Sequence, residues 1–276
     1  MRNAIVPNAC GVGLRDVHYD IVTALMPPIP WLEVHSENFF TSSNYVHHVL
    51  EIITTHYPVS FHSVGLSLGS TDRLDSNHLK KLKNLISLYK PVLISEHLAW
   101  SSVEGVFLHD LLPLPYCSDS LQLLCDKVQQ VQDYLGQRIL IENPALYVKF
   151  PESTIPEYDF LNQLVEKTDC GILLDISNLY ISSHNLSFVA EEYLAQINTD
   201  AIYEIHLAGF SQSAKGLLID SHNGAIAEVV LVLFEYFIKN YGVRPVIFEQ
   251  DQDIPVLQEL IDQAEKVNAI IKEYVA

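Results

Sequence analysis

The sequence is poor in basic residues: 16 Lys and Arg stand against 34 Asp and Glu, giving a formal charge of -18. Partners with phosphate backbones or anionic membrane surfaces attract clustered positive charge, so this balance disfavours both. The chain has no run of about 18 apolar residues, and its first residues lack the apolar core of a signal peptide. We therefore expect a cytoplasmic protein with no nucleic-acid or membrane partner.

Cysteine is also scarce. Cys10, Cys117, Cys125 and Cys170 show neither CxxC spacing nor a paired framework, so we expect reduced thiols rather than disulfides or a sulfur-rich metal site. Phosphate-binding loops are missing too. "GVGLR" does not complete a GxGxxG turn, and no GxxxxGK[ST] motif occurs, which disfavours a nucleotide cofactor.

What the chain does have is a large apolar fraction, 49% hydrophobic against 18% charged residues, enough for a sizeable core. Short apolar runs alternate with segments of helical spacing. The runs are 11–15, 31–35, 59–62, 92–96, 139–142, 172–175, 202–206 and 246–249. Strands that are apolar throughout indicate a parallel sheet covered on both faces. Eight of them predict one α/β domain over residues 1–276, a closed (β/α)8 TIM barrel, with an open doubly wound sheet as the alternative.

Most of these runs end on His, Glu or Asp. In a TIM barrel the carboxyl ends of the strands converge on one mouth, where catalytic groups gather. The polar residues at or just past the strand ends are His35, His62, Glu96, His97, Glu142, Asp175, Glu204, His206 and Glu249. The loops beyond add Asn178, His184, Asp220 and His222. A single histidine at such a place is more often structural, but seven strands of eight ending this way indicates a site.

The charges of this group point to metal ions. Its carboxylates face few cations in the sequence, with only Arg15 closing a strand, so they must take up protons or bind metal. Imidazoles mixed with carboxylates favour iron, manganese or zinc over calcium or magnesium. The candidates outnumber the ligands of one ion, which predicts two or three metals. Zinc would suit hydrolysis and iron would suit oxygen activation, and spacing leaves that choice open.

A set of motifs in fixed order carries a family resemblance. "EVHSEN", "FHSVGLSLGS", "SEHLAWS", "HDLLPLPY" and "EIHLAG" are among them, and together they cover about Gly11 to Pro255. The sequence resembles the multinuclear non-heme iron-dependent oxidative enzymes. The resemblance implies a xylose-isomerase-like TIM barrel with two or three irons of mixed Fe2+ and Fe3+ state and O2 as co-substrate. It also implies, as substrate, cysteine or another residue of a ribosomally synthesised precursor peptide, and a separate partner protein that recognises the leader.

The same resemblance implies roles for individual residues. One iron is expected on His62, His97 and Glu142. Glu142 is expected to bridge to a second iron on Asp175, His206 and Glu249. A third is expected on Asp220 and His222, with Asn178. Residues expected to bind substrate or to support the ligands are His35, Glu37, Asn38, Glu96 and His184.

Three positions depart from the family pattern. Phe210 stands after "EIHLAG" in place of His, Leu186 replaces the His of a usual Asn-His pair, and Gln250 replaces a Trp. They leave the ligands intact and indicate a different substrate pocket. Two other functions remain open at this point: a zinc- or manganese-dependent hydrolase or sugar isomerase on the same barrel, and a non-enzymatic metal-binding protein. Outside the strand ends, His78 is expected to be solvated, and residues 101–116 to form a long loop.

Overall fold

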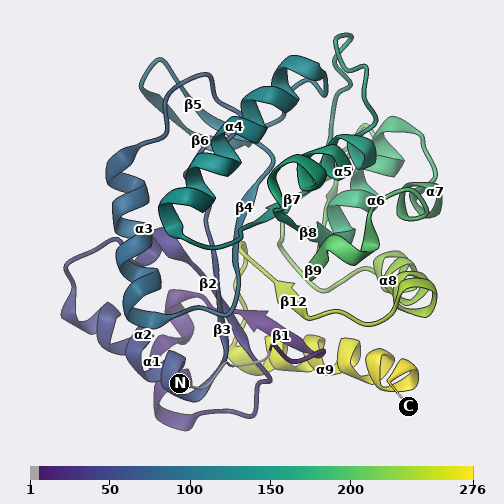
Figure 1. The fold of residues 1–276 in the computed structure, drawn as a ribbon. Helices are drawn as coiled ribbons and strands as arrows, with labels where there is room; N and C mark the ends of the chain where they lie inside the picture. Colours follow the sequence, from purple (N-terminus) through teal and green to yellow (C-terminus); the bar gives the residue numbers. More distant parts are fainter. Residues whose placement is uncertain (1–5, 276) are drawn as a thin grey trace.

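Eight parallel strands form a closed barrel in the computed structural model, which describes residues 6–275 (Figure 1). Around the barrel their order is β1-β12-β9-β8-β7-β4-β3-β2. Their bounds are Cys10–Gly13 for β1, Leu32–His35 for β2, Val59–His62 for β3, Ile94–His97 for β4, Leu140–Glu142 for β7, Gly171–Asp175 for β8, Ile202–Ala208 for β9 and Val246–Glu249 for β12. The predicted TIM barrel is confirmed, and the open doubly wound sheet was wrong.

Helices surround the barrel because each crossover between parallel strands carries its own apolar stripe (Figure 1). The helices are α1 Tyr19–Leu25, α2 Asn44–His56, α3 Ser76–Tyr89, α4 Ser118–Leu135, α5 Glu157–Thr168, α6 Ile176–Leu186, α7 Ala190–Leu194, α8 Glu228–Tyr241 and α9 Leu257–Tyr274. Short 3-10 turns occur at Asp16–His18, Ser36–Phe39 and Thr199–Ala201. The last helix is tied to the first strand: Cys10 N donates to Asn268 Oδ1 at 2.7 Å, and Asn268 Nδ2 donates to Cys10 O at 3.0 Å.

Two small hairpins stand apart from the barrel. β5 (Trp100–Val103) pairs with β6 (Val106–Leu112), and β10 (Ser211–Gln212) pairs with β11 (Leu218–Ile219). The long loop predicted at 101–116 is therefore wrong over most of its length, because residues 101–112 belong to a hairpin. Its tip residues Glu104 and Gly105 both have positive φ and donate backbone N–H groups to the Asp72 carboxylate.

The register of the barrel brings the polar strand ends to one level. His35 pairs with His62, His97 with Glu142, and Asp175 with His206. Because every strand is parallel, these ends share the same mouth. Among residues 6–275, no helix combines the length and the apolar character that crossing a membrane requires.

The first two strands approach so closely that only glycine fits at position 11. A Cβ on Gly11 would lie 2.2 Å from the backbone oxygen of Trp31, an atom that cannot move aside. We expect Gly11→Ala to lower the free energy of unfolding by about 1–3 kcal/mol or more, as overpacking does. In Gly224→Ala the new Cβ meets nothing within 4 Å, so this control should change stability by less than about 0.5 kcal/mol. Urea unfolding followed by circular dichroism measures both, and equal stabilities would contradict the close approach.

Candidate metal centre

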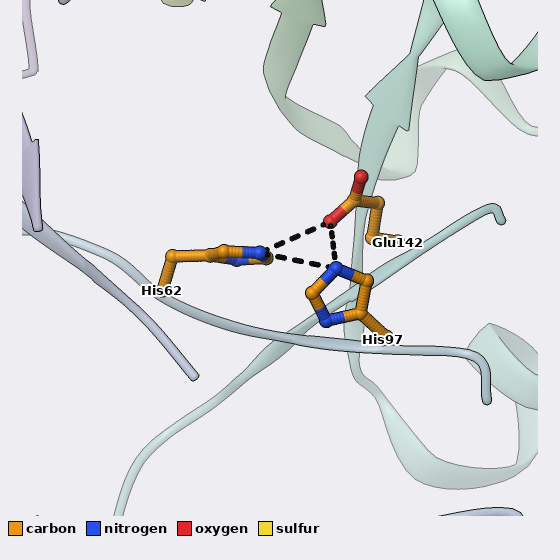
Figure 2. Close-up of side chains that lie close together, drawn as sticks. All are labelled: His62, His97 and Glu142. Atoms are coloured by element: carbon orange, nitrogen blue, oxygen red, sulfur yellow. Dashed lines mark hydrogen bonds and ion pairs between the residues drawn. The ribbon is translucent and has the colours of Figure 1, made fainter. Parts of the chain in front are cut away.

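Three side chains from neighbouring strands meet in a triangle at the barrel mouth (Figure 2). His62 Nε2, His97 Nε2 and Glu142 Oε2 lie 3.3 Å from one another on every side. A zinc-sized ion about 2.1 Å from each of its ligands keeps tetrahedral neighbours about 3.4 Å apart. The triangle therefore has the size of one face of a metal site.

Buried groups behind this triangle fix the two imidazoles. His62 Nδ1 lies 2.7 Å from Ser95 Oγ, and His97 Nδ1 lies 3.5 Å from Glu96 Oε1. Glu96 is itself held, because its Oε2 accepts the Leu66 N–H at 2.9 Å. Groups of this kind orient ligating imidazoles and leave the other ring nitrogen free for an ion.

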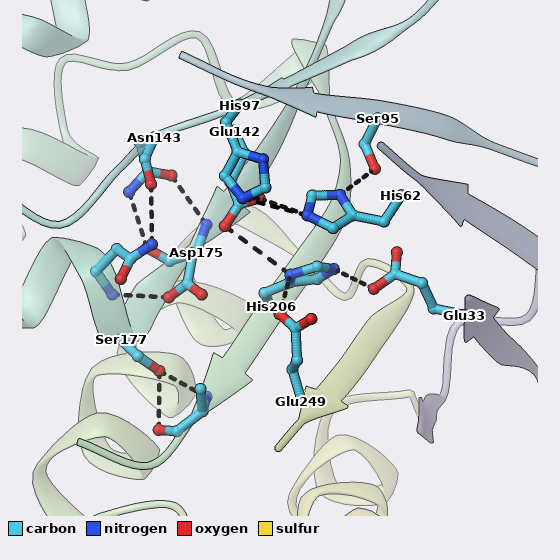
Figure 3. A network of polar contacts seen from close by, with 12 residues as sticks. Glu33, His62, Ser95, His97, Glu142, Asn143, Asp175, Ser177, His206 and Glu249 are labelled. Carbon is cyan, nitrogen blue, oxygen red and sulfur yellow. Dashed lines mark hydrogen bonds and ion pairs between the residues drawn. The ribbon is translucent and has the colours of Figure 1, made fainter. Parts of the chain in front are cut away.

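A second cluster lies beside the first and shares Glu142 with it (Figure 3). Glu142, Asp175 and His206 each offer an atom within 4.8 Å of the others. His206 Nδ1 is 4.0 Å from Glu142 Oε1 and 3.2 Å from Glu249 Oε2. One oxygen of Glu142 thus faces each cluster, which is the geometry of a carboxylate bridging two ions.

Asp175 is positioned by the start of α6. As the N-cap residue, its Oδ1 accepts the Asn178 N–H at 2.7 Å, while Asn143 bonds to its backbone on both sides. Its Oδ2 is buried and has no hydrogen-bond partner in the part of the chain that the structure describes. Burial, together with the nearby Glu142 carboxylate, raises the pKa of Asp175 to about 8.

The remaining predicted ligands gather around Glu249. His222 Nε2 lies 2.8 Å from Asp220 Oδ1, and His222 Nδ1 lies 3.5 Å from Glu249 Oε2. Asn178, expected with them, contacts the second cluster instead: its backbone N–H donates to Asp175 Oδ1, and its Nδ2 donates to Asn143 O. Asp220 and His222 thus form a pair at the edge of the site, with Glu249 between them and His206.

Three residues contact the predicted ligands although the sequence did not predict these contacts: Arg15, Asp251 and Glu33. Arg15 was placed at a strand end without a partner, but its Nη2 donates to Glu249 Oε1 at 2.7 Å and it also binds Asp251. Asp251 forms a third candidate group with His35 and Glu249 and lies 3.1 Å from His222 Nδ1. The sequence predicted that the carboxylates of the site lack cations nearby. At Glu249 this prediction was wrong.

Glu33 is the third missed residue, and it lies inside the barrel below the mouth. Its Oε1 is 3.1 Å from His206 Nε2, and both side chains are fully buried with Glu204. Burial and the neighbouring Glu33 raise the pKa of Glu204 well above its usual range. The sequence did contain a sign of this, because "LEVH" and "YEIHLA" both carry Glu two residues before His. Alternate residues of a strand point to the same side, so each Glu could have been predicted to face the same way as its His.

The residues expected to support the site fall in different places. His35 Nε2 lies 3.2 Å from Glu249 Oε1. Glu37 Oε1 accepts the N–H groups of Val64 and Gly65 and lies 3.0 Å from His78 Nε2, so His78 is partly buried rather than solvated as predicted. Asn38 and His184 are exposed.

The three departures from the family pattern lie around the site rather than in it. Phe210 packs on Tyr180, with ring centroids 5.6 Å apart. Gln250 Nε2 donates to the backbone oxygens of Gln252 and Asp253, which holds the loop after β12. Leu186 lines a cavity beside the barrel mouth.

The donor set fits metal ions because the site leaves buried polar atoms unsatisfied. Among residues 6–275, Glu142 Oε2, Asp175 Oδ2, Asn178 Oδ1 and His206 Nδ1 are buried and form no hydrogen bond. Each such atom costs about 1–3 kcal/mol when left unpaired. A cation held between them would satisfy several at once.

Metal binding at this site should strengthen as the pH rises. Although burial opposes it, the Glu142 and Glu96 carboxylates raise the pKa of His97 to about 9, and the pKa of Asp175 is about 8. Both groups hold protons at neutral pH in the metal-free protein, and both must release them to coordinate an ion. Competition titrations of the metal-free protein at pH 6, 7 and 8 should give affinity that increases at each step, with protons released into a dye-reported buffer. Affinity independent of pH would contradict this account.

Fold and site together define a TIM-barrel protein with clustered imidazoles and carboxylates at its mouth. Comparison with known proteins gives the particular family. The model of the RiPP precursor modification enzymes MbnB/TglH/ChrH matches residues 9–272, and the chain belongs to this family. RiPPs are ribosomally synthesised peptides that are modified after translation, so the family acts on precursor peptides.

Individual relatives and solved structures are also similar to this chain. A UPF0276 protein of Vibrio parahaemolyticus is 42% identical over 266 residues, covering 95% of this chain and 92% of its own. A UPF0276 protein of Chromobacterium violaceum is 41% identical over 266 residues, covering 96% of each chain. Among structures, D-allulose 3-epimerase from Methylomonas sp. has a TM-score of 0.60 at 14% identity, covering 98% of each chain. Endonuclease IV from Thermus thermophilus has a TM-score of 0.58 at 16% identity, covering 96% of this chain and 99% of its own. These structures share the fold.

Proposed function

We propose that this protein is an iron- and O2-dependent oxidative enzyme that modifies cysteine, or another residue, of a ribosomally synthesised precursor peptide. The observation that carries the proposal is the position of Glu142, whose two oxygens face two clusters of imidazole and carboxylate groups. A shared carboxylate between histidines is suited to two adjacent ions. The family supplies the substrate class, a precursor peptide.

The proposed ligands divide among two or three irons of mixed Fe2+ and Fe3+ state. One is held by His62, His97 and Glu142, and the next by Glu142, Asp175, His206 and Glu249. The pair Asp220 and His222 holds a third, now with Asp251 as a further neighbour, while Asn178 contacts Asp175 instead. Iron with His and carboxylate ligands and open positions supplies oxygen activation.

The chain's own residues prepare the site for this chemistry. Glu96 and Ser95 fix the rings of His97 and His62, so that one nitrogen of each faces the centre. Arg15 holds one oxygen of Glu249 and leaves the other toward His206 and His222. Protons held by His97 and Asp175 in the metal-free state leave through the mouth when the ions bind.

We also propose a separate partner protein that recognises the leader of the precursor. The formal charge of -18 supports a basic leader or partner. The test is turnover of the precursor peptide encoded beside the gene, with its partner protein, by enzyme loaded anaerobically with Fe2+. A mass change of the peptide that requires both iron and O2 is expected. Equal turnover without O2, or turnover with zinc or manganese in place of iron, would contradict the proposal.

A further inference from the structure

A cavity of about 750 Å³ lies beside the barrel mouth, between the loop that follows β7 and the segment that joins α6 to α7. Its walls include Leu146 and Val148 from the first of these, and Leu186 and Phe188 from the second. Ligand sites in proteins are typically hollows of about 300–1,000 Å³ with apolar walls and a few polar groups. This cavity has that size and that lining.

One carboxylate, Glu157 at the start of α5, lines the cavity. Its two oxygens accept hydrogen bonds from Tyr116 Oη at 2.8 Å and Tyr193 Oη at 3.0 Å. Within residues 6–275 no ion pair joins it to a cation. The tyrosines orient the carboxylate, and when Glu157 is ionised no cation among the described residues pairs with it, so a cationic ligand can supply the missing charge.

Aromatic side chains line the cavity together with this carboxylate. Tyr193 meets Tyr158 edge to face, with ring centroids 5.7 Å apart, and stacks on Phe188 at 6.3 Å. Phe150 adds a further ring to the lining. Aromatic faces attract organic cations, and Arg most of all. A carboxylate and several aromatic rings in one cavity therefore suit an apolar stem that carries a positive charge.

The loop after β7 connects this cavity to the candidate metal centre. It begins at Glu142 and Asn143 in the site, its Tyr147 hydroxyl accepts the N–H of Asp220, and its Leu146 and Val148 line the cavity. Val148 follows Glu142 by six residues, and six extended residues span at most about 20 Å. The cavity therefore lies within about 20 Å of the mouth, and one peptide can reach both.

We propose that the cavity binds a Lys or Arg side chain of the precursor peptide, a few residues from the residue that is modified. Glu157 pairs with the charge, and Tyr158, Phe188 and Tyr193 hold the stem. This subsite rests on the proposed function for the identity of the peptide. Its chemistry, a cation on an apolar stem, follows from the cavity alone.

Binding to the metal-free protein tests the subsite without any enzyme activity. The probes are acetyl-Leu-Arg-Leu-amide, acetyl-Phe-Arg-Phe-amide and their citrulline twins, which have the same shape and no charge. NMR titration should give a Kd below about 1 mM for at least one arginine peptide. Its citrulline twin, and the same peptide on Glu157→Gln, should bind about tenfold more weakly because an ion pair is lost. Glu191→Gln removes an exposed carboxylate of α7 and should bind as the parent does.

A second variant and a pH series keep the test decisive. Phe188→Ala leaves Glu157 in place and should weaken the arginine and citrulline peptides alike. Burial raises the pKa of Glu157 to about 7, so arginine peptides should bind more tightly as the pH rises through that value. The pKa values of Tyr116 and Tyr193 are raised well above 10, and Tyr158, Lys149 and Glu192 are the other titratable groups that line the cavity. Equal binding of arginine and citrulline peptides, or no binding of any probe, would overturn the proposal.

An assay with the precursor separates this proposal from the proposed function. In the iron-loaded enzyme, Glu157→Gln should raise KM for the precursor about tenfold and leave kcat unchanged. If the protein failed to oxidise any peptide, the binding result with the metal-free protein would still stand. If oxidation occurred and Glu157→Gln left KM unchanged, the subsite alone would be wrong.

Discussion

Protein carrying Glu142→Gln is expected to lose at least one metal ion per chain and all oxidative activity. Glu142 is almost fully buried, its Oε2 lies 3.3 Å from both His62 and His97, and its other oxygen faces His206. Glutamine keeps the shape of the side chain but can offer only one oxygen and cannot neutralise two ions. Metal analysis by mass spectrometry of the purified variant measures the loss.

Glu166→Gln is the matched control for that experiment, because Glu166 is exposed on α5. It should keep the metal content of the parent. Circular dichroism checks that both variants are folded. A Glu142→Gln protein that is folded and holds as much metal as the parent would show that the two clusters are not joined through this residue.

Metal affinity is expected to fall about 10- to 100-fold in Glu33→Leu, the range seen when a carboxylate behind a ligating histidine is removed. Glu33 Oε1 lies 3.1 Å from His206 Nε2, inside the barrel and away from the mouth. This contact places the Glu33 carboxylate against Nε2, which favours a proton on that nitrogen and leaves Nδ1 free toward Glu142 and Glu249. Without an acceptor the proton is free to move to Nδ1, where it blocks the ion.

Glu33→Gln separates orientation from charge, because the amide oxygen still accepts the His206 N–H. It should cost less than Glu33→Leu. Although burial opposes it, the Glu33 and Glu249 carboxylates raise the pKa of His206 well above its usual value. Nitrogen chemical shifts of His206 in the metal-free proteins, recorded at a pH high enough to remove the second ring proton, report the tautomer and do not depend on activity. Equal metal affinities for Glu33→Leu and the parent, with an unchanged tautomer, would assign Glu33 a purely structural role.

The barrel could be predicted from the sequence because its strands are short, apolar throughout and separated by helical patterns. The predicted bounds of the third, fifth and eighth strands match the structure to within one residue. The fourth strand was placed too early, at 92–96 rather than Ile94–His97, although Val92 N already donates to Val59 O of β3 at 2.9 Å. Parallel strands then bring their polar ends together without further information, which is why His62, His97, Glu142, Asp175 and His206 meet.

The parts that could not be predicted depend on loops and on the reach of long side chains. Arg15 contacts Glu249 and Asp251 across 234 and 236 residues of sequence, a pairing that no periodicity reveals. His184 follows the same helix as Asn178 but is exposed, and its Nε2 lies 3.1 Å from Gly216 O. The sequence placed His184 near the site along the chain, but the rotation of the helix turns its side chain toward solvent.

Fold alone does not decide between the possible chemistries. Epimerases and an endonuclease share this barrel, and one fold can support many reactions through its mouth residues. The donor set, with carboxylates and imidazoles and without thiolates, is compatible with iron, manganese and zinc. The distinction therefore lies in the identity of the ions.

The most direct test is metal content with Mössbauer spectra of protein grown on iron-57, measured beside His62→Ala, Glu142→Ala and Asp220→Ala. We expect two or three irons per chain, with spectra of coupled Fe2+ and Fe3+ sites and stepwise loss of iron in the variants. Zinc or manganese bound in place of iron, with no iron retained, would contradict the account.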